Sequence, residues 1–378
     1  MSKVYDCIVL GCGAIGSAAL YYAARKGWRV LGLEQFRPGH DRGSSHGQTR
    51  IIRQAYFEHP DYVPLALESY RRFAEIEQAS NESLFFETGL LQVGHPDGLV
   101  IQGVQRAAKQ HSLDITELSN ADLAAKYPQF QCRASDVGLF EKVAGFLRVE
   151  KCVETFARLA TESGAELICG TRVQSWQDSQ VGFTVTTDSD SFHTRRLIVT
   201  AGAWTSTFLP AEWSRLRIVA KHQHWFDVQD DRLNLDANCP VFFFETDAGY
   251  FYGFPKIDER GCKLAEHSGG QGVETADALN RDLDMVDLQR VQDFMHSTLN
   301  CPRGIHKSHS TCMYTMSPDE HFIVDAHPEL LNLAFACGLS GHGFKFSPTL
   351  GQALVDMVDG ERRPDMDFLS CRRFATST

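Results

Sequence analysis

Residues 5–34 read YDCIVLGCGAIGSAALYYAARKGWRVLGLE, and this stretch decides the fold. An apolar run of strand length, residues 4–10, ends at Gly11-Cys-Gly-Ala-Ile-Gly16, and an Ala-rich helical run covers residues 17–25. A second apolar run follows over residues 29–33. In such a G-x-G-x-x-G turn the first glycine allows the tight bend and the second lets the backbone approach a pyrophosphate. The third lets the helix lie close to the strand. The stretch therefore predicts a β-α-β unit that binds a dinucleotide, rather than a glycine-containing loop without a ligand.

Glu34 stands at the end of the second predicted strand. A carboxylate at this place accepts hydrogen bonds from the hydroxyl groups of a ribose. Its negative charge repels a 2′-phosphate, so FAD and NAD fit the pattern better than NADP.

The composition is that of an ordinary globular protein, with 378 residues, 43% of them hydrophobic and 22% charged. The net charge of −11 and the lack of a Lys/Arg-rich tract argue against a nucleic-acid partner. No apolar run reaches the ~20 residues of a membrane-spanning helix, and no secretion signal precedes the first strand. We therefore expect a cytoplasmic protein without a membrane partner. The eleven cysteines include no C-x-x-C pair, which favours reduced thiols over disulfides or a zinc site, and we expect no metal.

Helix-like and strand-like patterns alternate along the rest of the chain. Helical spacing marks residues 62–78 and 152–163, buried-strand patterns mark residues 167–173 and 196–200, and short β-like runs dominate from residue 218 to residue 310. The pattern predicts an α/β fold in which a Rossmann-like dinucleotide-binding domain, built from three segments, is interleaved with a mostly β substrate domain. The predicted segments are 1–85, 146–215 and 320–378 for the first domain, and 86–145 and 216–319 for the second.

Three further stretches carry a specific resemblance. They are GSSHGQTRIIR at residues 43–53, STCMYT at residues 310–315 and GLSGHGFK at residues 338–345. Together with the first β-α-β unit they resemble the monomeric sarcosine oxidase / N-methyltryptophan oxidase family of D-amino-acid-oxidase-like flavoenzymes. The resemblance runs nearly end to end. It implies FAD as the cofactor, a flavin-dependent amine oxidase as the activity, and a monomer as the state of the chain.

Cys312 matches the family cysteine that bonds covalently to the 8α-methyl group of the flavin. Taken alone, one cysteine among eleven is more often an inert buried thiol. A thiolate can add to the electrophilic methyl of an oxidised flavin, and nearby cations lower the pKa of the thiol. The resemblance therefore implies 8α-S-cysteinyl FAD at this position.

Arg53 and Lys345 match the pair that holds the substrate carboxylate, and Lys263 matches the lysine that activates oxygen. A guanidinium fork with an ammonium suits a carboxylate, since each charged hydrogen bond contributes ~1.5–3 kcal/mol. A fixed cation beside reduced flavin stabilises the superoxide that forms when O₂ takes the first electron. Alone, Arg53 would be assigned to a surface ion pair and Lys263 to a solvated strand position.

The resemblance also implies roles for residues that would individually be as often structural as functional. The further catalytic residues are His46, Arg50, Tyr252, His267 and Tyr314, and the further substrate contacts are Glu58, Phe243 and Gly341. The expected cofactor contacts are Gly11, Gly13, Ala14, Ile15, Gly16, Glu34, Gln35, Ser44, Thr49, Arg50, Val173, Ala201, Gly202, Trp204, Cys312, Gly338, Gly341, Gly343, Phe344 and Lys345.

Departures from the family pattern bear on the substrate. Gln48 replaces an acid, Ser45 and Gln54 each replace a histidine, and Phe243 replaces a methionine. Residues 266–271, EHSGGQ, are closer to the N-methyltryptophan branch than to the sarcosine branch.

The implied reaction starts from a neutral amine, because hydride leaves carbon only as the nitrogen lone pair forms an iminium. The hydride passes to the flavin, the imine hydrolyses, and O₂ reoxidises the flavin to give hydrogen peroxide. The candidate substrates are N-methyl amino acids such as sarcosine or N-methyltryptophan, and cyclic imino acids. Three alternatives remain open: electron transfer to a quinone or carrier protein, an NAD dehydrogenase, and a dinucleotide-binding subunit without turnover.

Overall fold

A parallel sheet formed around the first β-α-β unit organises one half of the molecule. The computed structural model describes residues 3–180, 182–300 and 304–374. The sheet is six-stranded, and its strands pair in parallel except for the antiparallel edge strand β21. Its inner strands are buried along their whole length because both faces are covered, and they are apolar except for Glu34 at the end of β3. In order across the sheet the strands are β10 (Glu166–Cys169), β3 (Val30–Glu34), β2 (Cys7–Leu10), β14 (Leu197–Val199), β22 (Leu333–Cys337) and β21 (Ile323–Ala326).

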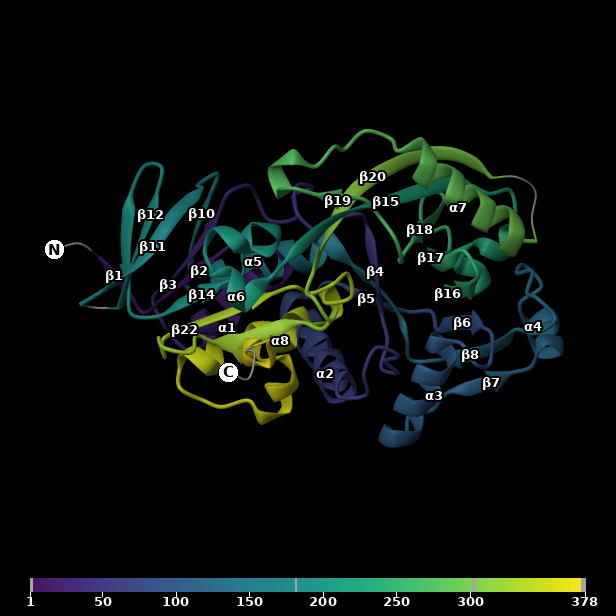
Figure 1. Ribbon diagram of the computed structural model, residues 1–378, viewed down its shortest axis with the longest axis horizontal. Helices are drawn as coiled ribbons and strands as arrows, with labels where there is room; N and C mark the ends of the chain where they lie inside the picture. The colour runs from purple at the N-terminus through teal and green to yellow at the C-terminus, as the bar shows by residue number, and fades with distance from the viewer. Residues whose placement is uncertain (1–2, 181, 301–303, 375–378) are drawn as a thin grey trace.

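Different layers cover the two faces of this sheet. The helix α1 packs between α5 and α8 on one face, and a four-stranded sheet lies at the end of the molecule that carries the N-terminus (Figure 1). The helices are α1 (Ala14–Arg25), α2 (Tyr62–Ser80), α5 (Val149–Glu162) and α8 (Ser347–Val358). The strands of the small sheet are β1 (Val4–Tyr5), β13 (Ser191–Thr194), β12 (Gly182–Thr187) and β11 (Val173–Ser179).

A nine-stranded sheet forms the other half, on the right of Figure 1. Its longest strands, β15 and β20, pair along most of their length and reach back toward the parallel sheet. The strands are β19 (Gly272–Val273), β15 (Arg217–Asp227), β18 (Cys262–Glu266), β17 (Gly249–Phe254), β16 (Val241–Thr246), β6 (Leu90–Gly94), β8 (Val137–Glu141), β7 (Thr116–Leu118) and β20 (Ile305–Met316). The helices on it are α3 (Leu99–His111), α4 (Asn120–Lys126) and α7 (Met285–Thr298).

A small three-stranded sheet lies between the two halves and brings residues 49–52 toward both. It consists of β4 (Thr49–Ile52), β9 (Gly145–Arg148) and β5 (Phe85–Glu87). The short helices are α6 (Ala211–Ser214), η1 (Gly202–Thr207), η2 (Asp231–Leu233), η3 (Leu235–Ala237), η4 (Ala276–Ala278), η5 (Phe344–Phe346), η6 (Pro364–Leu369) and η7 (Cys371–Phe374).

The α/β fold and the opening β-α-β unit are confirmed. The first strand is interrupted at Asp6, whose carboxylate accepts a hydrogen bond from the backbone N–H of Arg29. The prediction of one strand over residues 167–173 is wrong: it ends at Cys169 because Gly170 adopts φ +70°, and Val173 begins a strand in another sheet. The division of the chain at the predicted domain boundaries stays a prediction.

Candidate functional site

The main cavity opens at the ends of β2 and β3, where the glycine-rich turn lies. Gly11 adopts φ +84°, and a Cβ there would lie 2.7 Å from the carbonyl oxygen of Thr200. A Cβ on Gly16 would strike the carbonyl of Gly11, so the third glycine serves the packing of helix on strand. Glu34 lines the cavity, and its carboxylate accepts the backbone N–H groups of Cys12 at 2.8 Å and Phe36 at 3.0 Å.

Most of the expected cofactor contacts meet in this cavity. Gly16, Thr49, Cys312 and Lys345 are not among the residues that line it. The expected cofactor contacts that do are Gly11, Gly13, Ala14, Ile15, Glu34, Gln35, Ser44, Arg50, Val173, Ala201, Gly202, Trp204, Gly338, Gly341, Gly343 and Phe344, and Tyr314, expected as a catalytic residue, lines it as well.

Cys312 lies on β20, fully buried, beside two basic side chains. Arg50 Nη2 is 3.5 Å from Cys312 Sγ, and it also donates to the carbonyl oxygen of Ser44 at 3.1 Å. Burial raises the pKa of the Cys312 thiol, but His46 and Arg50 outweigh that effect and lower the pKa to about 7. Burial instead raises the pKa of the thiols of Cys7, Cys12, Cys132, Cys152, Cys169, Cys239, Cys337 and Cys371. Cys312 is therefore the thiol best prepared to react.

Lys263, on β18, is 1% exposed, and backbone groups of the segment around β4 surround its ammonium. Its Nζ donates to the carbonyl oxygens of Gly47 at 2.6 Å and Thr49 at 2.9 Å, and to Thr49 Oγ1 at 3.3 Å. Burial, and then the charge of Arg50, hold the pKa of Lys263 well below its ordinary value.

Arg53 and Lys345 meet on the ring of Tyr56. The Arg53 guanidinium lies 4.0 Å and the Lys345 Nζ 5.1 Å from the ring centroid. Lys345 donates to the Tyr56 hydroxyl at 3.1 Å and to the carbonyl oxygen of His342 at 2.8 Å. Burial, and then the charge of Arg53, lower the pKa of Lys345 to about 7.

Glu58 supplies the only carboxylate that Arg53 binds in the described parts of the chain. Arg53 Nη2 donates to both of its oxygens, at 2.7 Å and 2.6 Å. Burial raises the pKa of Glu58, but Arg53, His342 and Lys345 together lower it to about 2. The site therefore already holds one carboxylate on its guanidinium.

His267, directly after β18, and three aromatic side chains on the nine-stranded sheet lie beside this cluster. His267 Nδ1 is 3.3 Å from the Tyr314 hydroxyl, and its ring lies 5.8 Å from that of Phe243. Tyr252 hydrogen-bonds to Tyr314. Burial, and then the charge of Lys221, lower the pKa of His267 to about 3, so its ring is neutral at ordinary pH. Gly341 must be a glycine here, because its Cβ would run into the ring of Tyr314.

Three buried polar residues in the site were not predicted. Glu141 accepts the backbone N–H of Gln54 at 2.5 Å, and burial raises its pKa to about 7. His342 joins Tyr56 through Nδ1 at 2.9 Å. Lys221 is the third, and it was detectable as an isolated charge inside the strand pattern RIVAKHQHWFD.

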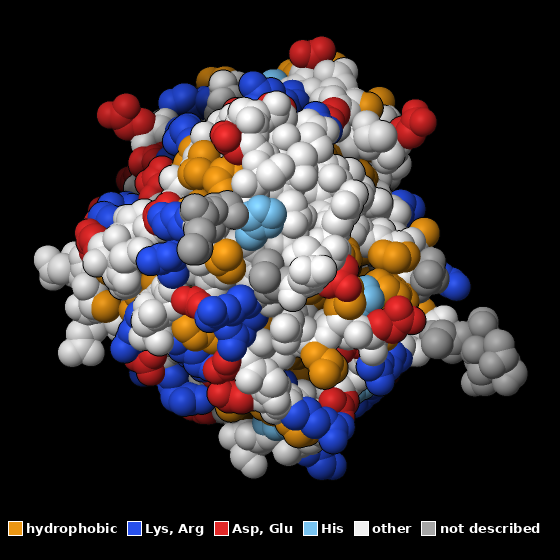
Figure 2. All heavy atoms as spheres, turned by 90° about the vertical axis from the view of Figure 1, so that its left-hand side faces the viewer, with side chains coloured by type: hydrophobic (Ala, Val, Ile, Leu, Met, Phe, Trp, Pro, Cys, Tyr) orange, Lys and Arg blue, Asp and Glu red, His pale blue; other side chains and the backbone are white. Residues whose placement is uncertain are grey.

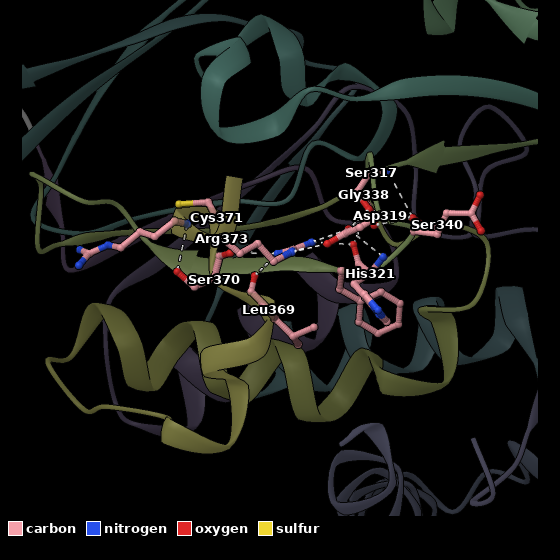
Figure 3. A network of polar contacts seen from close by, with 12 residues as sticks. Ser317, Asp319, His321, Gly338, Ser340, Leu369, Ser370, Cys371 and Arg373 are labelled. Carbon is pink, nitrogen blue, oxygen red and sulfur yellow. Dashed lines mark hydrogen bonds and ion pairs between the residues drawn. The ribbon is translucent and has the colours of Figure 1, made fainter. Parts of the chain in front are cut away.

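A network behind the site fixes the turn that follows β22 (Figure 3). Ser340 Oγ donates to the carbonyl oxygen of Gly338 at 3.0 Å and accepts the N–H of Ser317 at 3.2 Å. Arg373, near the end of the described chain, grips Asp319 through Nε at 2.7 Å and Nη2 at 3.0 Å. The C-terminal segment thus supports two residues that line the cavity.

Three further observations concern the surface and the composition of the described ranges. Figure 2 shows lysine and arginine side chains mixed with acidic ones on the face at the N-terminal end. No group of three or more His, Cys, Asp or Glu side chains in the described ranges could hold a metal ion. None of the helices in those ranges is both long and apolar enough to cross a membrane.

Residues 6–357 match the family model described as FAD dependent oxidoreductase (DAO). The chain belongs to this family. It is 35% identical to monomeric sarcosine oxidase from Arthrobacter sp. (strain TE1826), over 99% of this chain and 97% of that protein. It is 33% identical to N-methyl-L-tryptophan oxidase from Salmonella heidelberg (strain SL476), over 97% of this chain and 98% of that one.

Solved structures share the fold. NikD, described as an unusual amino acid oxidase essential for nikkomycin biosynthesis, superposes with a TM-score of 0.85 at 21% identity, covering 98% of both chains. L-proline dehydrogenase from P. horikoshii gives a TM-score of 0.83 at 16% identity, covering 99% of both chains. The cavity fits the FAD that the family binds, since the glycine turn, Glu34 and the acidic thiol of Cys312 all lie at or beside it.

Proposed function

We propose that this flavin-dependent oxidoreductase oxidises a carboxylated secondary amine, namely an N-methyl amino acid or a cyclic imino acid. The observation that carries the proposal is the buried Arg53–Lys345 pair on Tyr56, which is suited to a substrate carboxylate. The names of the relatives, sarcosine oxidase and N-methyl-L-tryptophan oxidase, support the same substrate class.

FAD held along the cavity by the glycine turn and Glu34 would supply the oxidising centre, which would take up a hydride from the substrate carbon and be reoxidised by O₂ with formation of hydrogen peroxide. Arg53 and Lys345 bind the substrate carboxylate and so fix the orientation of the amine. Neutral His267, with Tyr314, is placed to hydrogen-bond the amine, which must be in its neutral form before oxidation. The aromatic side chains of Phe243 and Tyr252 exclude water from this side of the pocket.

Lys263 is the residue we assign to the oxygen reaction. Its pKa is depressed, and a developing anion nearby raises the pKa again and so stabilises the ammonium form. The backbone acceptors on Gly47 and Thr49 hold the side chain in place for this role.

We also propose that Cys312 carries FAD through an 8α-S-cysteinyl bond. The pKa of about 7 for its thiol, set by His46 and Arg50 against burial, provides the thiolate. Denatured wild-type protein should keep its yellow colour, and Cys312→Ala should release free FAD on denaturation. A colourless wild-type precipitate, with an unmodified peptide spanning residue 312, contradicts this.

The test of the function is an anaerobic titration of the purified protein with sarcosine, N-methyltryptophan, proline and pipecolate. We expect at least one of them to bleach the flavin absorbance, and admission of air to restore it with formation of one peroxide per turnover. If none bleaches the flavin, the proposed function fails. Bleaching without peroxide in air indicates a quinone or carrier protein as the acceptor instead.

A monomeric state and a cytoplasmic location complete the proposal. The monomer is supported by the name of the relatives, and the location by the cysteines, since none of those in the described ranges forms a disulfide. The proposed domains are 1–85, 146–215 and 320–378 for FAD, and 86–145 and 216–319 for substrate, in line with the strands of the two large sheets.

A further inference from the structure

Lys221 is a buried cation that the proposed chemistry has not used. It lies on β15, directly opposite Cys312 on β20, and is 5% exposed. Its Nζ donates to the carbonyl oxygens of His267 at 2.8 Å, Ser268 at 2.6 Å and Gly269 at 2.8 Å. An ammonium has three N–H groups, so one turn of the chain takes all of them.

The turn after β18 depends on that cation. Gly269 and Gly270 adopt φ +66° and +100°, and three successive carbonyl groups point to the same ammonium. On its other side the turn is held to β17, where the N–H of His267 donates to the carbonyl oxygen of Tyr250 at 2.7 Å. Without Lys221 the three carbonyls of this half-exposed turn would lose the one donor that draws them together, and separate water molecules would have to replace it.

The same ammonium also faces Tyr314. Its Nζ lies 5.0 Å from the centroid of the Tyr314 ring, and the Tyr314 hydroxyl is 3.3 Å from His267 Nδ1. One side chain therefore contacts both members of the His267–Tyr314 pair, the backbone of one and the ring of the other.

We infer that Lys221 is a positioning residue that sets His267 and Tyr314 at the substrate amine. The placement of a substrate amine at His267 and Tyr314 rests on the proposed function, whereas the contacts of Lys221 with them do not. Because the protein takes all three N–H groups, Lys221 binds no substrate itself, and carboxylate binding stays with Arg53 and Lys345.

The charges around Lys221 predict when the turn loosens. Burial lowers its pKa to about 8, Glu266 and Asp287 raise it, and Arg217 and Arg290 lower it. The neutral His267 and Tyr314 complete its surroundings. Above that pH a neutral amine has two N–H groups for three carbonyls, so alkaline pH weakens the turn.

Three substitutions separate the tether, meaning the three hydrogen bonds from Lys221 to the turn, from a general effect on folding. Lys221→Met removes the tether, and Lys221→Gln keeps part of the hydrogen bonding without the charge. Lys221→Arg keeps the donors as well as the charge. The matched control is Lys307→Met, which removes an exposed lysine on β20 that donates to the carbonyl oxygen of Glu259 at 2.8 Å.

Anaerobic stopped-flow reduction of the holoenzyme by the amine that bleaches it is the kinetic test. In Lys221→Met we expect the limiting rate of flavin reduction to fall about 10- to 100-fold, while the amine Kd changes less than about threefold. Lys221→Gln should give a reduction rate between those of Lys221→Met and the wild type. Lys221→Arg should restore the rate and keep it at pH values above 8, where the wild-type rate declines. Equal losses in rate and affinity, or a rate unchanged in Lys221→Met, overturn the inference.

Hydrogen exchange of the holoprotein tests the role of Lys221 independently of the proposed function. In Lys221→Met the His267 amide should exchange at least about tenfold faster than in Lys307→Met. If no amine bleaches wild-type flavin, the proposed function fails, yet faster exchange still supports the tether. Unchanged exchange overturns the inference whatever the enzyme oxidises.

Discussion

The region around Lys263 and the region around Lys345 both bury a lysine, but they use it differently. The Lys263 ammonium meets three acceptors, all from Gly47 and Thr49. The Lys345 ammonium donates to two acceptors in the described chain, Tyr56 and His342, and has a third N–H for a ligand.

The difference indicates which of the two buried lysines has, within the part of the chain that the structure describes, a free N–H to bind a carboxylate. Beside Lys345, the Arg53 guanidinium is already occupied by the carboxylate of Glu58, which shows that this pocket accommodates negative charge. Around Lys263 the acceptors are uncharged and belong mostly to the backbone, so that lysine is fixed in place rather than offered to a carboxylate.

Arg53→Met should give the largest effect. If it left the KM unchanged, the region around Lys345 would not differ from the region around Lys263 in binding a carboxylate. Charged hydrogen bonds to the substrate carboxylate, of about 1.5–3 kcal/mol each, are lost, so the KM for a carboxylated amine should rise at least about 100-fold. The measurement is steady-state kinetics on variants with matched FAD content. Arg53→Lys should lose less, and an uncharged amide of the same amine should change little; equal losses for acid and amide would refute the carboxylate role.

Lys263→Met tests the other region. Flavin reduction should stay within about threefold of wild type, whereas reoxidation by O₂ should slow about 100-fold, as expected for removal of one preorganised charge. The two half-reactions are followed separately by stopped flow. Lys307→Met is the control, and normal reoxidation in Lys263→Met would remove this lysine from the oxygen reaction.

The pH dependence of carboxylate binding sharpens the contrast. Because burial lowers the pKa of Lys345 to about 7, its ammonium is present below that pH and lost above it. A bound carboxylate favours the ammonium, so the Kd of a non-oxidisable carboxylate should rise up to about tenfold per pH unit above 7. Titrations of flavin absorbance from pH 6 to pH 9 measure this.

Two variants assign that dependence. Lys345→Arg stays charged and should bind with little change over this range. Glu141 also has a pKa raised to about 7, so Glu141→Gln must keep the dependence if Lys345 causes it. A flat profile in Glu141→Gln would transfer the effect to that carboxyl group.

The smallest effects should come from removing one uncharged acceptor on each side. Thr49→Val deletes one of the three acceptors of Lys263 and should slow reoxidation about threefold without changing carboxylate affinity. Tyr56→Phe deletes one of the two acceptors of Lys345 and should weaken carboxylate binding about 3- to 10-fold without changing reoxidation. The reverse pattern would show that the two lysines are assigned to the wrong steps.

The parts of the fold that depend on local chain geometry could be predicted. The turn from Gly11 to Gly16 needs glycine for reasons that act within a few residues, and the strands on either side are continuous apolar runs. The break at Gly170 was missed because its left-handed backbone turns a run that reads as one strand into two, in different sheets.

The charged pocket could be predicted only in part. The resemblance pointed to Arg53, Lys345 and Glu58, but not to the hydrogen bonds from Arg53 Nη2 to both oxygens of Glu58 or to the support from His342. The contacts of Glu141 and Lys221 could not be predicted, because their partners are backbone groups 86 or 87 and 46 to 48 residues away, which no local pattern encodes.

The strand pairing of β15 with β20 has a consequence for how the holoprotein matures. The groups that lower the pKa of Cys312 come from the segment around residues 46–50. They meet the thiol only after β15 has paired with β20 and the three-stranded sheet has assembled. A nascent or misfolded chain lacks that environment, so under the proposal the flavin bond is made by the finished protein on itself. The covalently coloured fraction of a preparation then counts the molecules that reached the native state.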